Sequence, residues 1–163
     1  EGAWIHAFLA EQSLPRKLSL LVDNCGDPDQ GSQAIAQLIA NESPDRAAAF
    51  AFAVYPAALK GRLPIGAEGV NDLAKLAVPL FDAEGELAWQ ERLSEKGTSH
   101  PVIASIGQVL APLRDTRLAR ARQFLTACVV RGIALPSPAA LEPQLNECVK
   151  LLRKTSPAAG AQP

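Results

Sequence analysis

The side chains best suited to nucleophilic chemistry are three cysteines, Cys25, Cys128 and Cys148. A catalytic thiol needs a nearby base, and the chain has only two histidines, His6 and His100, neither of them in a recognisable nucleophile motif. The cysteines are odd in number and contain no CxxC pair, which argues against a disulfide framework and against a cysteine zinc site. We therefore expect three buried, small apolar residues in a reducing compartment.

The two histidines also offer no metal site. His6 lies on the expected core-facing edge of a helix, between Ile5 and Phe8, and is interpreted as a structural histidine. His100 precedes Pro101 at a helix start, where its side chain caps the helix or faces water. Neither has a second ligand at metal-binding spacing, so we expect no metal and no cofactor.

Acidic residues form two groups, one with the residue types of an acid–base pair and one with those of a calcium-binding loop. Glu84, Glu91 and Glu95 recur at helical spacing beside basic residues, which indicates a solvated ion-pair face rather than an acid–base pair. The segment 23–31 is rich in oxygen ligands, but a calcium loop starting at Asp23 or Asp27 lacks the glutamate required at its twelfth position. We interpret the segment as a tight turn in which Asp and Asn cap two helices.

Motifs of familiar enzymes are missing from the sequence, which contains no GxxxxGKS/T, HExxH or GxSxG. Their absence favours a non-enzyme, although the sequence leaves a catalytic role open.

The most informative charge pattern is a row of arginines, five within residues 114–131 against a single acid, Asp115. On a helix, one flank carries the predicted partner-binding residues Arg117, Arg120, Phe124 and Arg131. Such a row suits an acidic protein surface or a phosphate backbone. The alternative is a solvated flank that pairs with the glutamates of 84–95. Nucleic acid is disfavoured because the isoelectric point is about 6.2, not above about 9.

The elements that must position these residues are all predicted to be helices, because apolar residues recur at helical spacing and no run alternates as a strand does. The chain has 13 prolines and 11 glycines, many placed where helices start or stop. About nine helices are expected, over about residues 1–12, 15–25, 31–41, 44–55, 67–78, 82–96, 101–112, 116–131 and 137–154. The fourth starts at Ser43-Pro44-Asp45, with Ser43 as N-cap and Pro44 at the first helical position.

The prolines, the glycines and the apolar spacing also predict several helix ends and one central helix. Pro56 is expected to kink or end its helix, Pro79 to end its helix, and Pro143 to cause a kink or a restart. Gly26 is expected to stop the second helix. Residues 47–55 are apolar nearly all round, which predicts a helix at the centre of the bundle.

The predicted fold class is therefore all-α, an irregular bundle of about nine helices around that central helix. We expect a single domain over 1–154, excised from a longer protein, and a disordered tail or linker over 155–163. The uncharged apolar run over 47–59, 13 residues, is too short to span a membrane, so no membrane partner is expected.

The function that fits best is a protein–protein interaction or adaptor domain that docks through a helical groove or the basic flank. Trp4, Tyr55 and Trp89 are expected to line the core or such a groove. One alternative is an effector-type domain that recruits a partner enzyme, as ubiquitin-ligase-like domains do, and another is a nucleic-acid-binding domain. Composition alone suggests a bacterial protein, located in the cytoplasm or secreted into a host cytosol.

Overall fold

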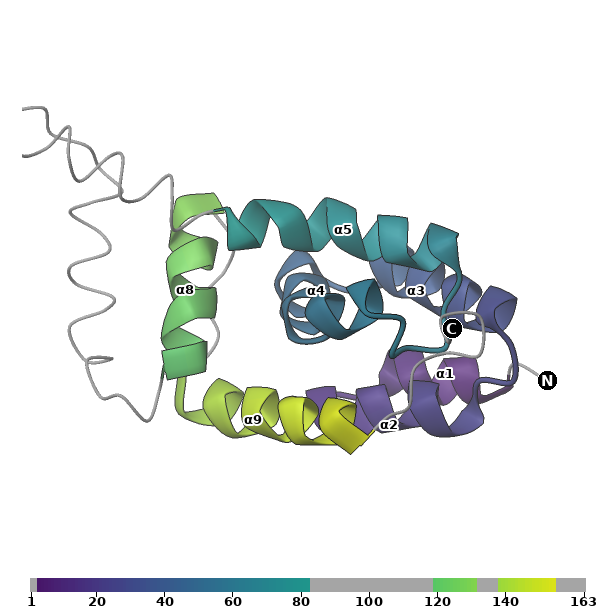
Figure 1. Ribbon diagram of the computed structural model, residues 1–163. Helices are drawn as coiled ribbons and strands as arrows, with labels where there is room; N and C mark the ends of the chain where they lie inside the picture. Colours follow the sequence, from purple (N-terminus) through teal and green to yellow (C-terminus); the bar gives the residue numbers. More distant parts are fainter. Residues whose placement is uncertain (1–2, 83–118, 132–137, 155–163) are drawn as a thin grey trace, which may run out of the picture. The chain divides into compact units, whose positions relative to one another are not determined.

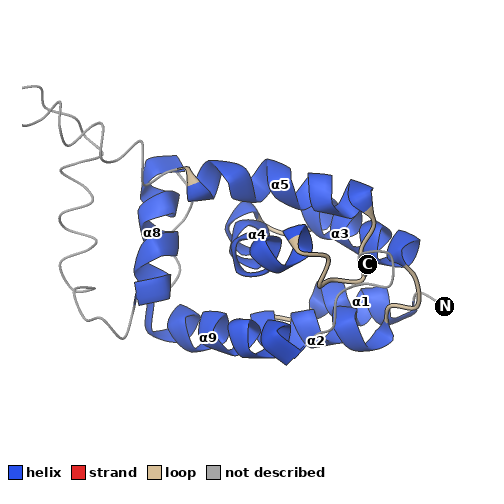
Figure 2. Ribbon diagram, viewed as in Figure 1, coloured by secondary structure: helices blue, strands red, loops and turns tan. Residues whose placement is uncertain are grey.

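A computed structural model describes residues 3–82, 119–131 and 138–154 of the chain. Helices are the only regular secondary structure in these residues, as Figure 2 shows, which confirms the all-α class. Figure 1 traces the seven helices, which are α1 (Ala3–Ala10), α2 (Leu14–Asn24), α3 (Pro28–Asn41), α4 (Pro44–Leu59), α5 (Ala67–Phe81), α8 (Ala119–Arg131) and α9 (Pro138–Lys154). The other two expected helices, over 82–96 and 101–112, lie outside the described residues.

The helix starts follow local capping signals. Asp27 has an extended backbone and its Oδ1 accepts a hydrogen bond from the Gln30 amide at 2.9 Å, so it caps α3 as the turn interpretation predicted. The cap places the start of α3 at Pro28, three residues earlier than expected. Gly26 does not adopt the left-handed conformation of a helix stop, because Gly61, with φ of 70°, is the only described residue with positive φ.

The three internal prolines were expected to end, bend or restart their helices. Pro79 lies inside α5, so the prediction that it ends its helix is wrong. Pro56 lies inside α4 and Pro143 inside α9, so neither ends its helix, and a bend at either residue stays a prediction. For Pro56 the compensation is visible, because Ala57 and Ala58 just after it are buried. Packing of that last turn offsets the hydrogen bond that proline removes.

The chain forms two compact units, residues 1–77 with 144–163, and residues 78–143. In the first unit α1 packs on α2 and α3, and the Phe8 ring meets the Phe50 ring edge to face at 5.6 Å. Five consecutive residues of α4, Ala47–Ala51, are buried, so this helix is covered on all sides through more than one turn. The single domain over 1–154 and the tail over 155–163 stay predictions.

Helix ends in each unit are capped by side chains from distant parts of the chain. In the first unit, Ser32 Oγ of α3 accepts the amide hydrogens of Gly66 and Gly69 at 2.9 and 3.2 Å, at the start of α5. Gln144 Oε1 of α9 accepts the Leu14 amide at 2.9 Å, at the start of α2. These bonds satisfy amides that a helix cannot pair by itself, and they tie the helices together.

In the second unit the buried carboxylate of Glu142 accepts the Ala121 amide of α8 at 2.6 Å. A carboxylate suits this position because the positive end of the helix dipole favours an anion.

The Ser32 cap leads to a stability prediction. Ser32→Ala is expected to lower the free energy of unfolding by about 1–2 kcal/mol, because it removes the acceptor of the buried Gly69 amide. The matched control is Ser43→Ala, since Ser43 stands at the start of α4 without a side-chain capping bond. Urea denaturation measures both variants, and an equal loss in the two would contradict the assigned cap.

Candidate functional site

The predicted basic flank of α8 is only partly at the surface. Arg120 and Arg131 are exposed near the two ends of the helix, and Arg117 lies outside the described residues. Phe124, the aromatic residue expected between the arginines, is fully buried at 0% exposure. Residues 124–128 are all buried, so α8 is covered on every side in this stretch. Phe124 therefore belongs to the core and not to a continuous surface row, while partner binding by the arginines stays a prediction.

Arg131 also contributes to the structure of its own unit. Its Nε donates a hydrogen bond to the backbone carbonyl of Pro79 at 3.0 Å. Pro79 lies in the last turn of α5, whose carbonyls lack partners within the helix. A guanidinium at this end complements the negative end of the helix dipole. The side chain thus joins α8 to the end of α5.

The cysteines resemble the predicted buried thiols, with one difference. Cys128 and Cys148 are fully buried, and burial raises the pKa of Cys148 to about 12. Cys25 is only half-buried, and its Sγ donates to the carbonyls of Asp27 and Pro64 at 3.0 and 3.3 Å. Burial raises its pKa too. At neutral pH Cys25 and Cys148 are therefore protonated thiols, which are weak nucleophiles.

The structure corrects the prediction for His6 and does not describe His100. His6 is exposed, not packed on a core-facing edge, because the neighbouring positions Ile5 and Phe8 take the buried side of α1. His100 lies outside the described residues. Within the described ranges, no three His, Cys, Asp or Glu side chains gather as a metal site would require. Across the same residues, no helix has the length and apolar character to cross a membrane.

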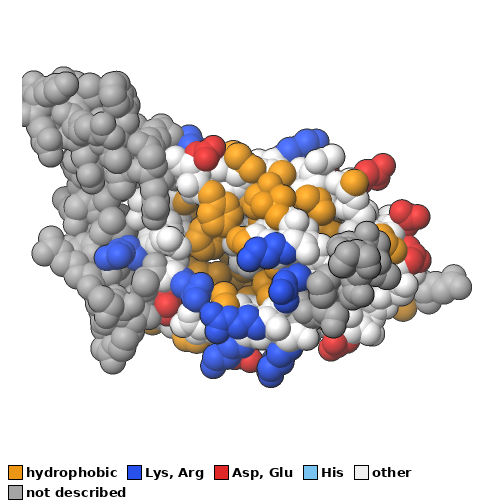
Figure 3. Space-filling model, viewed as in Figure 1, with side chains coloured by type: hydrophobic (Ala, Val, Ile, Leu, Met, Phe, Trp, Pro, Cys, Tyr) orange, Lys and Arg blue, Asp and Glu red, His pale blue; other side chains and the backbone are white. Residues whose placement is uncertain are grey.

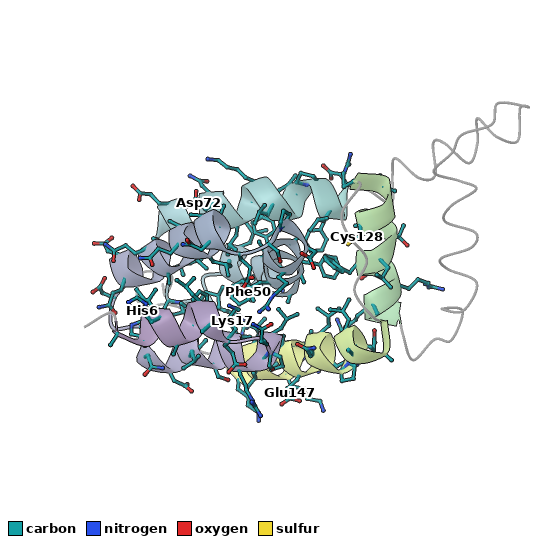
Figure 4. The ribbon with its side chains drawn as sticks, turned by 180° about the vertical axis from the view of Figure 1, so that it is seen from behind. His6, Lys17, Phe50, Asp72, Cys128 and Glu147 are labelled. Carbon is teal, nitrogen blue, oxygen red and sulfur yellow. The ribbon has the colours of Figure 1, made fainter. Side chains whose placement is uncertain are left out.

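The densest polar network surrounds Lys17, whose side chain is only 1% exposed. Its Nζ donates to the carbonyls of Phe8 and Leu9 at 2.6 and 3.3 Å, in the last turn of α1, and lies 3.5 Å from Glu42 Oε2. The ammonium also sits 4.9 Å from the centre of the Phe8 ring, a cation–π distance. Figure 4 shows Lys17 inside the helical bundle, close to Phe50.

This network is completed by the start of α4. Arg46 Nε lies 3.4 Å from Glu42 Oε1, and its guanidinium also bonds the Glu11 carbonyl and the Gln12 side chain. Burial lowers the pKa of Lys17, while Glu42 opposes the shift. All three hydrogens of a lysine ammonium have acceptors here, so Lys17 is a positioning residue that holds the end of α1.

Sequence reasoning missed Lys17, although a signal was present. Lys17 falls on the apolar stripe of α2, together with Leu14, Leu18 and Leu21. A charged residue at a core position of a helix is rarely buried without partners. The partners of Lys17, however, come from α1 and from the end of α3, and the residue pattern of α2 does not show which other helices lie beside it.

A second feature missed from the sequence is a partly exposed apolar face on the C-terminal half of α4. Phe52 and Tyr55 are half-buried, while Pro56 and Leu59 are exposed, Leu59 to 61%. The spacing i, i+3, i+4, i+7 puts these four side chains on one face. We call them the α4 stripe. Figure 3 shows hydrophobic side chains gathered in the centre of the view, over the region where Figure 1 draws α4 and α5, with Lys and Arg side chains beside them.

Comparisons with known proteins add no assignment: no protein-family model, no curated protein and no solved structure matches this chain. The candidate site therefore rests on the residues of the chain alone.

Proposed function

We propose that this chain is a protein-interaction domain that docks a partner through the α4 stripe. The observation that carries the proposal is the change in burial along α4. Residues 47–51 are covered on every side, whereas the two turns from Phe52 to Leu59 leave one face partly exposed. Clustered exposed apolar side chains on a folded domain mark contact surfaces. Aromatic residues are also enriched at interfaces, which suits Phe52 and Tyr55.

The charges beside the stripe favour an acidic partner, in line with the charge pattern of the sequence. Lys60 follows Leu59 directly, Arg62 comes two residues later, and residues 52–62 contain no Asp or Glu. Lys60 is exposed at the end of α4, where a cation also complements the helix dipole. A partner helix with an apolar face and acidic residues at one end would complement both properties.

The test is capture of partners with the full chain as bait, with variants run in parallel. Leu59→Glu is expected to reduce recovery of the partner at least about tenfold, because it places a charge at the most exposed part of the stripe. The matched control Ala36→Glu adds the same charge at an exposed position of α3 and is expected to bind as the wild type does. Both variants should unfold within about 0.5 kcal/mol of the wild type.

Equal recovery with Leu59→Glu and Ala36→Glu would remove the α4 stripe from the proposal. A further arm uses Arg117→Glu with Arg120→Glu, which tests the basic flank of α8 separately. Nuclease treatment of the lysate distinguishes the remaining possibility. Recovery that depends on nucleic acid, and falls steeply with salt, would favour the nucleic-acid alternative instead.

A further inference from the structure

The α4 stripe has a positively charged end. At about 100° per residue, its four side chains lie within about 100° of the helix surface, and Lys60 follows about 40° beyond Pro56. Pro56, Leu59 and Lys60 are all exposed, Leu59 to 61%. None of the described residues forms an ion pair with Lys60. The exposed part of the stripe therefore changes from apolar to positive at the C-terminal end of α4.

The backbone at the end of α4 fixes the position of Lys60. The amide of Gly61 donates to the carbonyl of Ala58 at 3.1 Å, and the amide of Arg62 donates to the carbonyl of Ala57 at 2.9 Å. Together with the φ of 70° at Gly61, these bonds form a Schellman motif, a common C-terminal helix cap. Lys60 thus begins from a defined backbone position next to the stripe.

The acids nearest in the chain do not neutralise this end. Residues 46–67 contain three cations and no Asp or Glu, and the acids that flank them are Asp45 and Glu68. Asp45 lies in the first turn of α4, about 22 Å from Lys60 along the helix axis. Glu68 lies in the first turn of α5, the end that the Ser32 bonds hold to α3. Within the described residues neither acid pairs with Lys60, so its ammonium can pair with a carboxylate from a bound protein.

We propose that the partner helix on the α4 stripe runs antiparallel to α4 and carries Asp or Glu in its first turn, beside Lys60. This inference rests on the proposed function, to which it adds the direction of the partner helix and the residue that selects it. An acid in the first turn of a helix is stabilised by the dipole of that helix, so an acid that pairs with Lys60 is best placed at the N-terminal end of the partner. The positive end of the partner dipole then also lies beside the negative end of the α4 dipole.

The experiment begins with a display library of amphipathic helices, selected on the immobilised full chain. The library varies the apolar stripe and allows Asp, Glu, Gln or Lys in the first and last turns. We expect helices with acids in the first turn to be enriched. The best binder is then synthesised as two peptides of the same composition, one with its acids in the first turn and one with them in the last turn. Fluorescence anisotropy measures the affinity of both.

Lys60→Gln is expected to weaken binding of the first-turn peptide about fivefold and to leave the last-turn peptide unchanged. Each peptide is compared with itself on the two proteins, so a difference in helicity between the peptides does not affect the result. Lys60→Glu should reject the first-turn peptide and bind a version with lysines in that turn. The matched control Lys75→Gln, which removes an exposed lysine of α5, should leave both affinities unchanged.

The remaining outcomes separate this inference from the proposed function. Enrichment of helices without acids, or a loss with Lys60→Gln that is confined to the last-turn peptide, equal in both or absent from both, would overturn the inference. The proposed function would still stand if Leu59→Glu weakened both peptides. Failure to enrich any helix, or equal binding to Leu59→Glu and the wild type, would overturn both. Circular dichroism and melting temperature are recorded for each variant to confirm its fold.

Discussion

Replacing Gly31 with alanine is expected to lower the free energy of unfolding by about 3 kcal/mol or more. A Cβ on Gly31 would overlap the carbonyl oxygen of Pro64 and would lie 2.9 Å from Cγ2 of Ile65. The first of these atoms is backbone, so no side-chain rotation relieves the overlap. The start of α3 would have to move away from the segment that leads into α5, which would also weaken the Ser32 cap.

Whether Gly31→Ala lowers or raises the free energy of unfolding distinguishes tertiary packing from helix propensity. Gly31 lies within α3, where alanine is ordinarily favoured over glycine by about 1 kcal/mol. Gly26 provides the matched control, because a Cβ there meets no atom within 4 Å and its φ is not positive. Gly26→Ala is therefore expected to be neutral, or to stabilise by up to about 1 kcal/mol through the unfolded chain.

Urea denaturation of the full chain, followed by circular dichroism, measures both glycine variants. For a chain of this length a loss of about 3 kcal/mol corresponds to a fall in melting temperature of about 6–12 °C. A Gly31→Ala variant as stable as Gly26→Ala would show that α3 and the segment before α5 do not approach as closely as described.

Lys17→Met is expected to lower the free energy of unfolding by about 3 kcal/mol. Methionine fills the space of the lysine stem but donates no hydrogen bonds, so the carbonyls of Phe8 and Leu9 lose their buried donor. Glu42 keeps Arg46 as an ion-pair partner, which limits the loss. Lys60→Met is the control, because Lys60 is exposed and its replacement should change stability by less than about 0.5 kcal/mol.

Thermal and urea unfolding of the two lysine variants measure this difference. The loss in Lys17→Met should accompany detachment of α1, detected as faster amide hydrogen exchange in residues 3–10. Equal stability of Lys17→Met and Lys60→Met would contradict the positioning role of Lys17.

The lowered pKa of Lys17 also predicts a dependence on pH with a defined sign. Between this lowered pKa and the ordinary value of 10.5, the folded chain has released the Lys17 proton while the unfolded chain retains it. Because the unfolded state binds more protons, stability rises with pH in this window. The wild type should therefore gain stability relative to Lys17→Met as the pH approaches 10.5. Urea unfolding at several alkaline pH values measures the difference, and a constant or falling difference would contradict the direction of the shift.

Much of the local structure could be predicted from the sequence. Asp27, and the Ser43–Pro44 pair before α4, signal helix starts through backbone geometry within a few residues. The apolar run that begins at Ala47 signals a buried helix, because no polar side chain interrupts it. The end of α5 was the local failure, because a proline such as Pro79 gives the same sequence signal whether or not later packing offsets the hydrogen bond that it removes.

The candidate sites depended far more on tertiary structure. Phe124 falls between arginines on a helical wheel, yet it is buried because α8 is covered on more than one side. The partly exposed face of α4 has the same apolar composition as the buried half of the helix, so only the positions of the other helices distinguish the two.

The amino-acid sequence by itself determined where the described helices form and that the fold is all-α, because capping and periodicity act over a few residues. Tertiary structure decided which lysine is buried, which aromatic residue is at the surface and which side chain caps which helix. The Leu14 amide, for example, finds its acceptor in Gln144, 130 residues along the chain. Burial and long-range hydrogen bonds depend on which segments meet in space, and the pattern of a single helix does not contain that information.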